Sequence, residues 1–122
     1  MIEKSSPLRE NMGRAGEDLA RKYLESQGFE IVELNYHYGH GEIDIIARDE
    51  EYLVFCEVKA RKNDEYGPPE YALTPRKQQQ IRRIAAGYLY ERDIHDQACR
   101  FDVVAIQFKG DEPEINHIKN AF

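Results

Sequence analysis

The clearest pattern of apolar and polar positions in this chain is a helical stripe after residue 74. Its members recur at i, i+3, i+4, i+7 and i+8, which places them on one helix face: Ile81, Ile84, Ala85, Tyr88 and Leu89. Thr74 is a favourable N-cap residue, and Pro75 suits the first helical position. The pattern therefore predicts an amphipathic helix that begins at this Thr-Pro pair.

A second amphipathic stretch lies nearer the N-terminus, from Gly13 to Gln27. Most of its residues are good helix formers, and its apolar residues are spaced for one buried face: Ala15, Leu19, Ala20, Tyr23 and Leu24. Gly28 is placed to end this helix. We expect residues 1–12 to form a flexible arm in front of a single domain at residues 13–122.

Three segments rich in β-branched and aromatic residues follow the first helix, namely Phe29–Tyr38, Gly41–Arg48 and Tyr52–Arg61. Turn-prone groups divide them, so we predict three consecutive antiparallel strands. Residues 62–73 are typical of a loop with one short helical turn.

A fourth strand is predicted at Phe101–Phe108, and a short edge strand at Glu114–Lys119. A chain of 122 residues suits one domain with one core. The order is helix, three strands, helix, strand. It packs most simply as a mixed central sheet flanked by helices, so we predict an α/β fold.

Composition agrees with a globular domain, because 41% of the residues are hydrophobic and 33% are charged. No apolar run approaches the roughly 20 residues that span a bilayer. Residues 1–7 contain no apolar stretch suited to a signal peptide. Cys56 and Cys99 do not form a disulfide framework, so we expect free thiols. We therefore expect a cytoplasmic protein with no membrane partner.

The formal net charge of -6 argues against polyanion binding by the whole surface. Basic residues are nevertheless clustered in two short segments: Lys59, Arg61 and Lys62, and then Arg76, Lys77, Arg82 and Arg83. Local patches can therefore still meet a polyanion.

Asp44 lies within a run of strand-forming apolar residues, where an unpaired carboxylate is costly to bury. On the next strand Glu57 and Lys59 stand two residues apart, so their side chains leave the sheet on the same face. If residues 47–53 form the hairpin connection, Asp44 lies beside Glu57. We therefore predict that the two carboxylates and the ammonium group share one side of the sheet, within reach of a common cation.

Two neighbouring carboxylates suit Mg²⁺, which keeps waters and substrate phosphate oxygens as further ligands. Such metal assistance supports in-line phosphodiester cleavage, with Lys59 orienting a water or stabilising charge on the phosphoryl group. The alternative is a structural ion-pair cluster at a sheet edge, the usual meaning of an isolated Glu-x-Lys. Asp44 favours the site, because a buried carboxylate demands compensation.

Glu17 is open to two interpretations. It is spaced i, i+3 and i+7 with Ala20 and Leu24, which turns it toward the packed side of the first helix, where it could join the site. Alternatively, it forms a helix-surface ion pair with Arg14 or Arg21.

Four other polar residues have less certain roles. Lys77 lies one turn before Ile81, so it could reach a phosphate at the mouth of the site or simply extend from the helix end. His37 and His40 have no other His or Cys nearby at zinc spacing, so we expect loop residues that touch nucleic acid. Asp102 is predicted to be an acid at the edge of the core, and a supporting role in the site is left open.

The motifs of this chain resemble a known family. Asp44 followed by Glu57-Val58-Lys59 matches the PD-(D/E)XK nuclease signature, with Ile43 in place of the signature proline. More closely, the chain from about Gly13 to Phe108 resembles the YraN-like uncharacterised bacterial family within that superfamily. Four segments carry this resemblance: Gly13-Arg14-Ala15-Gly16-Glu17, Gly41-Glu42-Ile43-Asp44, Glu57-Val58-Lys59-Ala60-Arg61 and Arg100-Phe101-Asp102-Val103.

The resemblance implies a restriction-endonuclease-like core of the Holliday-junction-resolvase type. It implies that Asp44 and Glu57 bind Mg²⁺, or Mn²⁺ in its place, with the carbonyl of Val58 as a further ligand. Lys59 would be the catalytic lysine, and the first helix would supply Glu17.

Two functions remain open at this stage. The first is a metal-dependent endonuclease acting on DNA, including branched or damaged structures, with Arg61, Lys62 and Lys77 contacting the nucleic-acid backbone. The second is a non-catalytic nucleic-acid-binding or protein-interaction module that retains the nuclease fold. The complete Asp, Glu and Lys set favours the first, and the acidic balance modestly favours the second. A homodimer is compatible with either, since resolvase-like relatives work as dimers.

Overall fold

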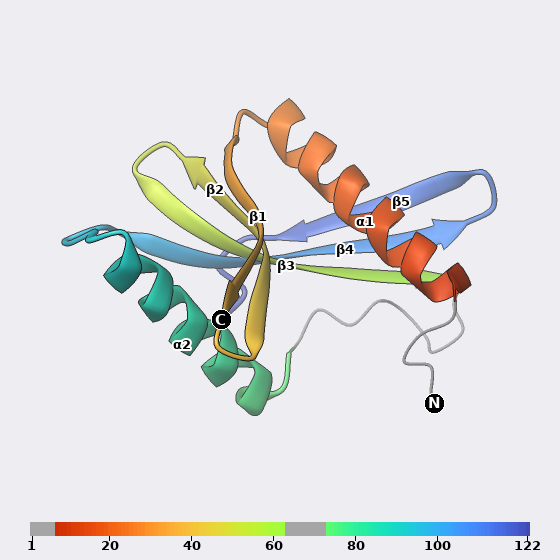
Figure 1. The fold of residues 1–122 in the computed structure, drawn as a ribbon. Coiled ribbons are helices and arrows are strands. Elements are labelled where there is room, and N and C mark those ends of the chain that lie inside the picture. Colours follow the sequence, from red (N-terminus) through yellow and green to blue (C-terminus); the bar gives the residue numbers. More distant parts are fainter. Residues whose placement is uncertain (1–6, 63–72) are drawn as a thin grey trace.

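The computed structural model describes residues 7–62 and 73–122. Two helices and five strands follow one another in the predicted order, and the edge strand is present (Figure 1). In chain order the elements are α1 (Pro7–Ser26), β1 (Glu30–Tyr38), β2 (Gly41–Asp49), β3 (Tyr52–Lys62), α2 (Pro75–Glu91), β4 (Cys99–Lys109) and β5 (Glu112–Ile118).

The five strands form one sheet in the order β1-β2-β3-β4-β5. β1, β2 and β3 are antiparallel neighbours, as predicted. β4 runs parallel to β3 after the crossover through α2, and β5 returns antiparallel to β4. This is the mixed sheet flanked by helices that the sequence predicts.

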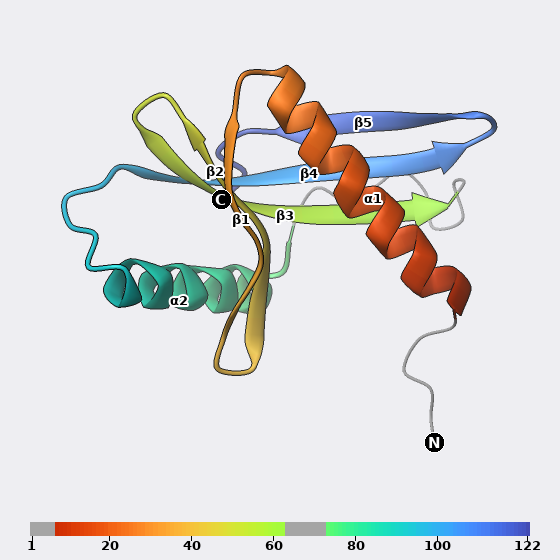
Figure 2. The same ribbon diagram turned by 45° about the horizontal axis from the view of Figure 1, so that its top comes forward.

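The helices α1 and α2 cover opposite faces of the sheet (Figures 1 and 2). Along β3, Leu53 and Phe55 pack with residues of α2, whereas Val54 and Cys56 pack with residues of α1. β3 is therefore buried on both faces over this stretch. Burial on both sides explains why its sequence is almost continuously apolar there rather than alternating.

The start of α2 is as predicted, and the start of α1 is not. Thr74 Oγ1 accepts a hydrogen bond from the Lys77 N–H at 3.1 Å, and Pro75 is the first helical residue. α1 begins at Pro7 rather than at Gly13. Proline fits the first helical turn, where a backbone N–H has no intrahelical partner in any case. Residues 1–6 of the predicted arm, and residues 63–72 of the loop predicted at residues 62–73, lie outside the described residues.

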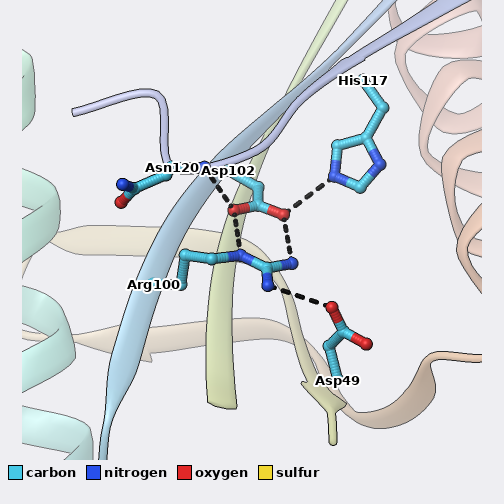
Figure 3. A network of polar contacts seen from close by, with 5 residues as sticks. All are labelled: Asp49, Arg100, Asp102, His117 and Asn120. Atoms are coloured by element: carbon cyan, nitrogen blue, oxygen red, sulfur yellow. Dashed lines mark hydrogen bonds and ion pairs between the residues drawn. The ribbon is translucent and has the colours of Figure 1, made fainter.

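A buried polar network joins β4 to β5 and to the C-terminal segment (Figure 3). Asp102 is fully buried. Its carboxylate accepts hydrogen bonds from Arg100 Nε at 3.0 Å, from His117 Nε2 at 2.8 Å and from the Asn120 N–H at 3.0 Å. Arg100 also pairs with Asp49, at the end of β2, at 3.0 Å. Asp102 is therefore a charge-paired acid of the core.

Burial alone would raise the pKa of Asp102. The hydrogen bonds from His117, Arg100 and the Asn120 N–H outweigh burial and hold this pKa below its ordinary value. The ionised carboxylate therefore contributes to the stability of the folded protein.

Two further expectations concern the cysteines and the membrane. Cys56 and Cys99 are free thiols, as predicted. Neither helix in the described part of the chain is long and apolar enough to cross a membrane.

We expect Asp102→Asn to destabilise the protein by about 3–5 kcal/mol at neutral pH, because it leaves the Arg100 guanidinium without its buried partner. Since the folded pKa of Asp102 is lowered, the contribution of the carboxylate is present above the ordinary value of 3.8 and is lost as the pH falls below it. Urea unfolding at neutral and at acidic pH measures the free energy of unfolding of the variant and of the wild type. The difference between the two free energies should become smaller in acid. Asp111→Asn, at an exposed turn, is the control. An equal difference at both pH values would contradict this account.

Candidate metal centre

Asp44 and Glu57 lie just beyond the last paired residues of the antiparallel strands β2 and β3. The register between the strands ends at Ile45↔Cys56, and Asp44 and Glu57 are the next residues on their strands. Beyond this pair, Asp44 Oδ2 accepts a hydrogen bond from the backbone N–H of Val58 at 2.9 Å. The carboxylate thus replaces the ladder bond that β2 no longer supplies, so a half-buried backbone donor remains satisfied.

The backbone of β2 is irregular at Asp44. Ile43 and Ile46 both pack with residues of α2, whereas Ile45 packs with residues of α1. A regular strand changes face at every residue, so this spacing requires a local break. In the neighbouring strand β1, Asn35 has φ of 51°, in the left-handed region that most residues avoid. The irregularity therefore involves both strands.

The carbonyl of Val58 faces the same side as its N–H group. In a β-strand, the N–H and C=O of one residue point toward the same neighbouring strand. Since the Val58 N–H points to Asp44, its carbonyl is also directed toward the opening between β2 and β3. This orientation is compatible with the ligand role that the resemblance implies.

Three carboxylates converge beside this opening. Glu17 of α1 and Glu42 and Asp44 of β2 each offer one oxygen, and the three oxygens lie within 4.8 Å of one another. Asn35 Nδ2 donates to Glu17 Oε1 at 3.1 Å and to Glu42 Oε2 at 3.0 Å, so one amide bridges two acids. Like charges at this separation are unfavourable unless a cation offsets them. The cluster is therefore a candidate site for a divalent cation.

Glu17 does not take part in the helix-surface pairing that we considered for Arg21. Arg21 Nη2 pairs with Asp18 Oδ1 at 2.6 Å, and Arg21 Nη1 pairs with Glu25 Oε1 at 3.1 Å. Glu17 instead contacts Asn35 across the gap between α1 and β1. Its place in the carboxylate cluster therefore depends on how α1 crosses the sheet.

Sequence reasoning did not single out Glu42. It precedes Asp44 by two positions, so strand parity alone favours a common face for both side chains. The two-residue spacing of Glu42 and Asp44 could therefore have identified Glu42 from the sequence. The proximity of Glu42 to Glu17 could not have been identified in this way, because it is set by the position of a helix from a distant part of the chain.

Glu57 stands apart from the three-carboxylate cluster. Its Oε2 lies 3.6 Å from Nζ of Lys77 on α2. Along β3 it has the parity of Phe55, which packs with α2. The sequence predicts a single face for Asp44 and Glu57. In the structure Glu57 approaches the opening from the side of α2, while Asp44 is grouped with Glu17 of α1.

The basic residues expected at the site are differently placed. Burial raises the pKa of Glu57, and the charges of Lys77 and Lys59 oppose that rise, so both lysines act on this carboxylate. Arg61 is half-buried, and Lys62 is exposed at the end of β3. The contacts of Arg61, Lys62 and Lys77 with nucleic acid stay predictions.

The electrostatics of the opening centre on Asp44. Burial, followed by the charge of Glu57, raises the pKa of Asp44 to about 8. The hydrogen bond from Val58 lowers this pKa, and the charges of Glu17 and Glu42 raise it further. Because Glu57 acts on Asp44 in this way, the two carboxylates form one electrostatic unit although they approach from different sides.

The donor set is suited to a hard cation. Among the described residues, the grouped ligand candidates are all carboxylates, and carboxylate oxygens are preferred by Mg²⁺. The prediction that both histidines are loop residues holds for His40, in the turn between β1 and β2, and is wrong for His37, which lies in β1 and pairs with Glu42 of β2. His37 Nε2 lies 3.4 Å from Glu42 Oε1. A structural zinc site would require more nitrogen or sulfur ligands. The residues present therefore fit Mg²⁺ or Mn²⁺.

A family model and individual relatives with known sequences all assign this chain to the same protein family. The chain matches the family described as "Uncharacterised protein family UPF0102" over residues 16–106, which include all three clustered carboxylates. It is 46% identical to a UPF0102 protein of Geobacter metallireducens over 112 residues, 92% of each chain. A relative in Geotalea daltonii is 49% identical over 91% of this chain and 88% of its own. A relative in Rhodococcus opacus is 45% identical over 91% of this chain and 95% of its own. As the sequence motifs indicate, the chain belongs to the UPF0102 family.

Proposed function

We propose that this protein is a metal-dependent endonuclease that hydrolyses phosphodiester bonds of DNA, with branched or damaged structures as its substrates. The observation that carries the proposal is the convergence of Glu17, Glu42 and Asp44, whose ligand oxygens lie within 4.8 Å of one another. Glu57 acts electrostatically on Asp44, and Lys59 acts on Glu57. Candidate oxygen ligands for a metal ion are thus linked electrostatically to the ammonium group of Lys59.

A purely structural ion-pair cluster would offset these carboxylates with lysine or arginine. Neutral donors supply three hydrogen bonds to these acids, and His37 Nε2 lies 3.4 Å from Glu42 Oε1. The Asn35 amide serves Glu17 and Glu42, and the Val58 N–H serves Asp44. A neutral donor leaves the negative charge in place, which favours occupation by a divalent cation. The arrangement therefore supports a metal site over a structural cluster.

Each residue of the centre has a distinct part in this proposal. Glu17, Glu42 and Asp44 would hold the cation, with Glu57 and the carbonyl of Val58 as further oxygen ligands. When bound, the cation supplies Lewis acidity and lowers the pKa of a coordinated water. The hydrogen bond from the Val58 N–H fixes the carboxylate of Asp44 before any substrate arrives.

Lys59 and Lys77 supply positive charge from two directions. Lys59 projects from β3, where its ammonium group would stabilise negative charge that develops on the phosphoryl oxygens. Lys77 reaches Glu57 from α2 and would orient the phosphate from that side. Both lysines oppose the rise in the pKa of Glu57, which keeps this carboxylate available as a ligand.

The most direct assay incubates the purified protein with linear, nicked, flapped and four-way DNA in magnesium or manganese. Cleavage by wild type and none by Asp44→Asn would support the proposal. If no DNA form is cut, the non-catalytic nucleic-acid-binding or protein-interaction module becomes the better description. We also propose a cytoplasmic location, where DNA and magnesium are both present. Analytical sedimentation would test whether the protein forms the proposed homodimer.

Asp44→Asn should change the pH dependence of stability when no divalent cation is present. The folded pKa of about 8 exceeds the ordinary value of 3.8, so between these values the folded protein keeps a proton that the unfolded chain releases. Wild-type stability should therefore fall as the pH rises through this window. The variant cannot ionise there, and it should exceed the wild type at the alkaline end by about 1 kcal/mol or more.

Thermal melts in EDTA at both ends of the window measure this difference. Added magnesium should raise the melting temperature of the wild type and leave that of Asp44→Asn unchanged. Equal magnesium shifts in the two proteins would show that Asp44 is not a ligand.

Lys59→Ala separates catalysis from binding. It should lose cleavage by roughly a hundredfold or more, the scale of one preorganised electrostatic contact. Its affinity for magnesium should hardly fall, because a lysine does not ligate the cation. Single-turnover cleavage and calorimetric titration of magnesium measure the two quantities. Lys22→Ala, an exposed lysine paired with Asp18 on α1, is the control. Cleavage by Lys59→Ala at the wild-type rate would make Lys59 structural.

Asn35→Gly tests whether the bridging amide organises the carboxylates. Glycine accepts the left-handed backbone of Asn35 without strain, so this variant removes the amide and preserves the strand. Magnesium affinity should fall by about tenfold to a hundredfold, the typical cost of losing an outer-shell partner of a metal ligand. The melting temperature in EDTA should hardly change. Unaltered magnesium affinity would show that Asn35 does not position Glu17 and Glu42.

A further inference from the structure

The first turns of α2 border a polar groove of about 580 Å³. Three of its six lining residues are cationic and none is acidic, although the chain carries a formal net charge of -6. The groove is lined by Thr74, Arg76, Lys77, Gln79, Gln80 and Arg83. Arg76 and Arg83 are exposed, so their charges face solvent. Three positive charges thus line one groove of a protein whose formal net charge is negative.

This groove adjoins the candidate metal centre. Lys77 lines it and also places Nζ 3.6 Å from Glu57 Oε2. At the other side, Gln80 Nε2 lies 3.6 Å from the position that a Cβ on Gly41 would occupy. Gly41 is the first residue of β2, the strand that carries Asp44. Two residues that line the groove therefore lie beside the strands of the metal centre, Gln80 near the start of β2 and Lys77 near Glu57 of β3.

The adjacent Arg82 has a different environment. Its guanidinium stacks over the rings of Phe101 at 4.7 Å and Phe122 at 5.4 Å, where the cation contributes to packing at the C-terminus. Arg82 does not line the groove, whereas Arg83 does. The cations of α2 are therefore divided between a structural contact and an open surface.

We propose that this groove binds the phosphate backbone of one strand of the nucleic acid, alongside the metal centre. The inference rests on the proposed function, because it places the flanking substrate against the same opening. Arginine and lysine neutralise phosphates, and glutamine side chains donate hydrogen bonds to phosphate oxygens without reading the base sequence. The lining is thus chemically suited to a DNA backbone of any sequence.

The spacing of the arginines agrees with this occupant. Arg76 and Arg83 are seven positions apart on one helix, which corresponds to about 10 Å along its axis. One strand of B-DNA carries about three phosphates over that axial length. Arg76 and Arg83 can therefore meet phosphates at the two ends of that length, and Lys77 lies next to Arg76. An acidic protein segment would also meet positive charge here, but its carboxylates need not follow this spacing.

The test compares Arg76→Gln/Arg83→Gln with Lys22→Gln/Lys119→Gln. Each double variant removes two positive charges. The control lysines pair with Asp18 and stack on Phe29, outside the groove. Binding of labelled duplex and four-way DNA is measured by fluorescence anisotropy in EDTA over a series of salt concentrations, so divalent-dependent cleavage does not intervene. A polyglutamate peptide serves as the competing polyanion.

The groove variant should bind DNA about tenfold to a hundredfold more weakly at moderate salt, and its slope of log affinity against log salt should be shallower by about 2. The control variant should keep the wild-type slope. If the groove variant does not fold, Arg76→Gln and Arg83→Gln made singly should each reduce the slope by about 1.

Several results would overturn the inference. These are equal slopes in wild type and groove variant, no DNA binding by the wild type, or stronger binding of polyglutamate than of DNA. Failure of the nuclease proposal is recognised separately. If the groove variant shows the reduced slope but no DNA form is ever cut by the wild type in magnesium, the groove stands and the catalytic function does not.

Discussion

The hydrogen bond from the Val58 N–H to Asp44 Oδ2, at 2.9 Å, connects the fold to the candidate metal centre. β2 stops pairing with β3 after Ile45↔Cys56, and the amide that follows needs an acceptor. Asp44 supplies that acceptor and is thereby held where burial raises its pKa to about 8. The local break in the sheet and the raised pKa of Asp44 are two consequences of the same geometry.

Two acids of this protein show how burial can serve structure or function. Asp102 is fully buried, but Arg100 and His117 bind its carboxylate and hold its pKa low. Asp44 has a raised pKa, a neutral backbone donor and the acidic neighbours Glu17 and Glu57. An acid whose charge is paired in this way, such as Asp102, stabilises the folded protein. Three other acids act on Asp44 as like charges, although Lys77 and Lys59 partly offset the charge of Glu57, and this arrangement favours a role in binding a cation.

The sequence predicted the parts of the structure that depend on local pattern. The Thr74-Pro75 start of α2 and the placement of Asp44 and Glu57 at neighbouring strand positions both follow from local signals. The position of Asp44 relative to Glu57 could not be predicted, because strand parity fails at the irregular point in β2, whereas Glu57 keeps the parity of Phe55 along β3. The bridge that Asn35 makes to the acids was equally hidden, since it depends on a left-handed residue and on a distant helix.

Anomalous diffraction from a crystal containing manganese tests most directly whether a divalent cation binds beside Asp44. We expect one strong anomalous peak at about 2.0–2.3 Å from a carboxylate oxygen of Asp44, also bonded to at least one oxygen of Glu17, Glu42 or Glu57. A well-ordered crystal at saturating manganese with no peak at Asp44, or with peaks only at unrelated surface acids, would contradict the account.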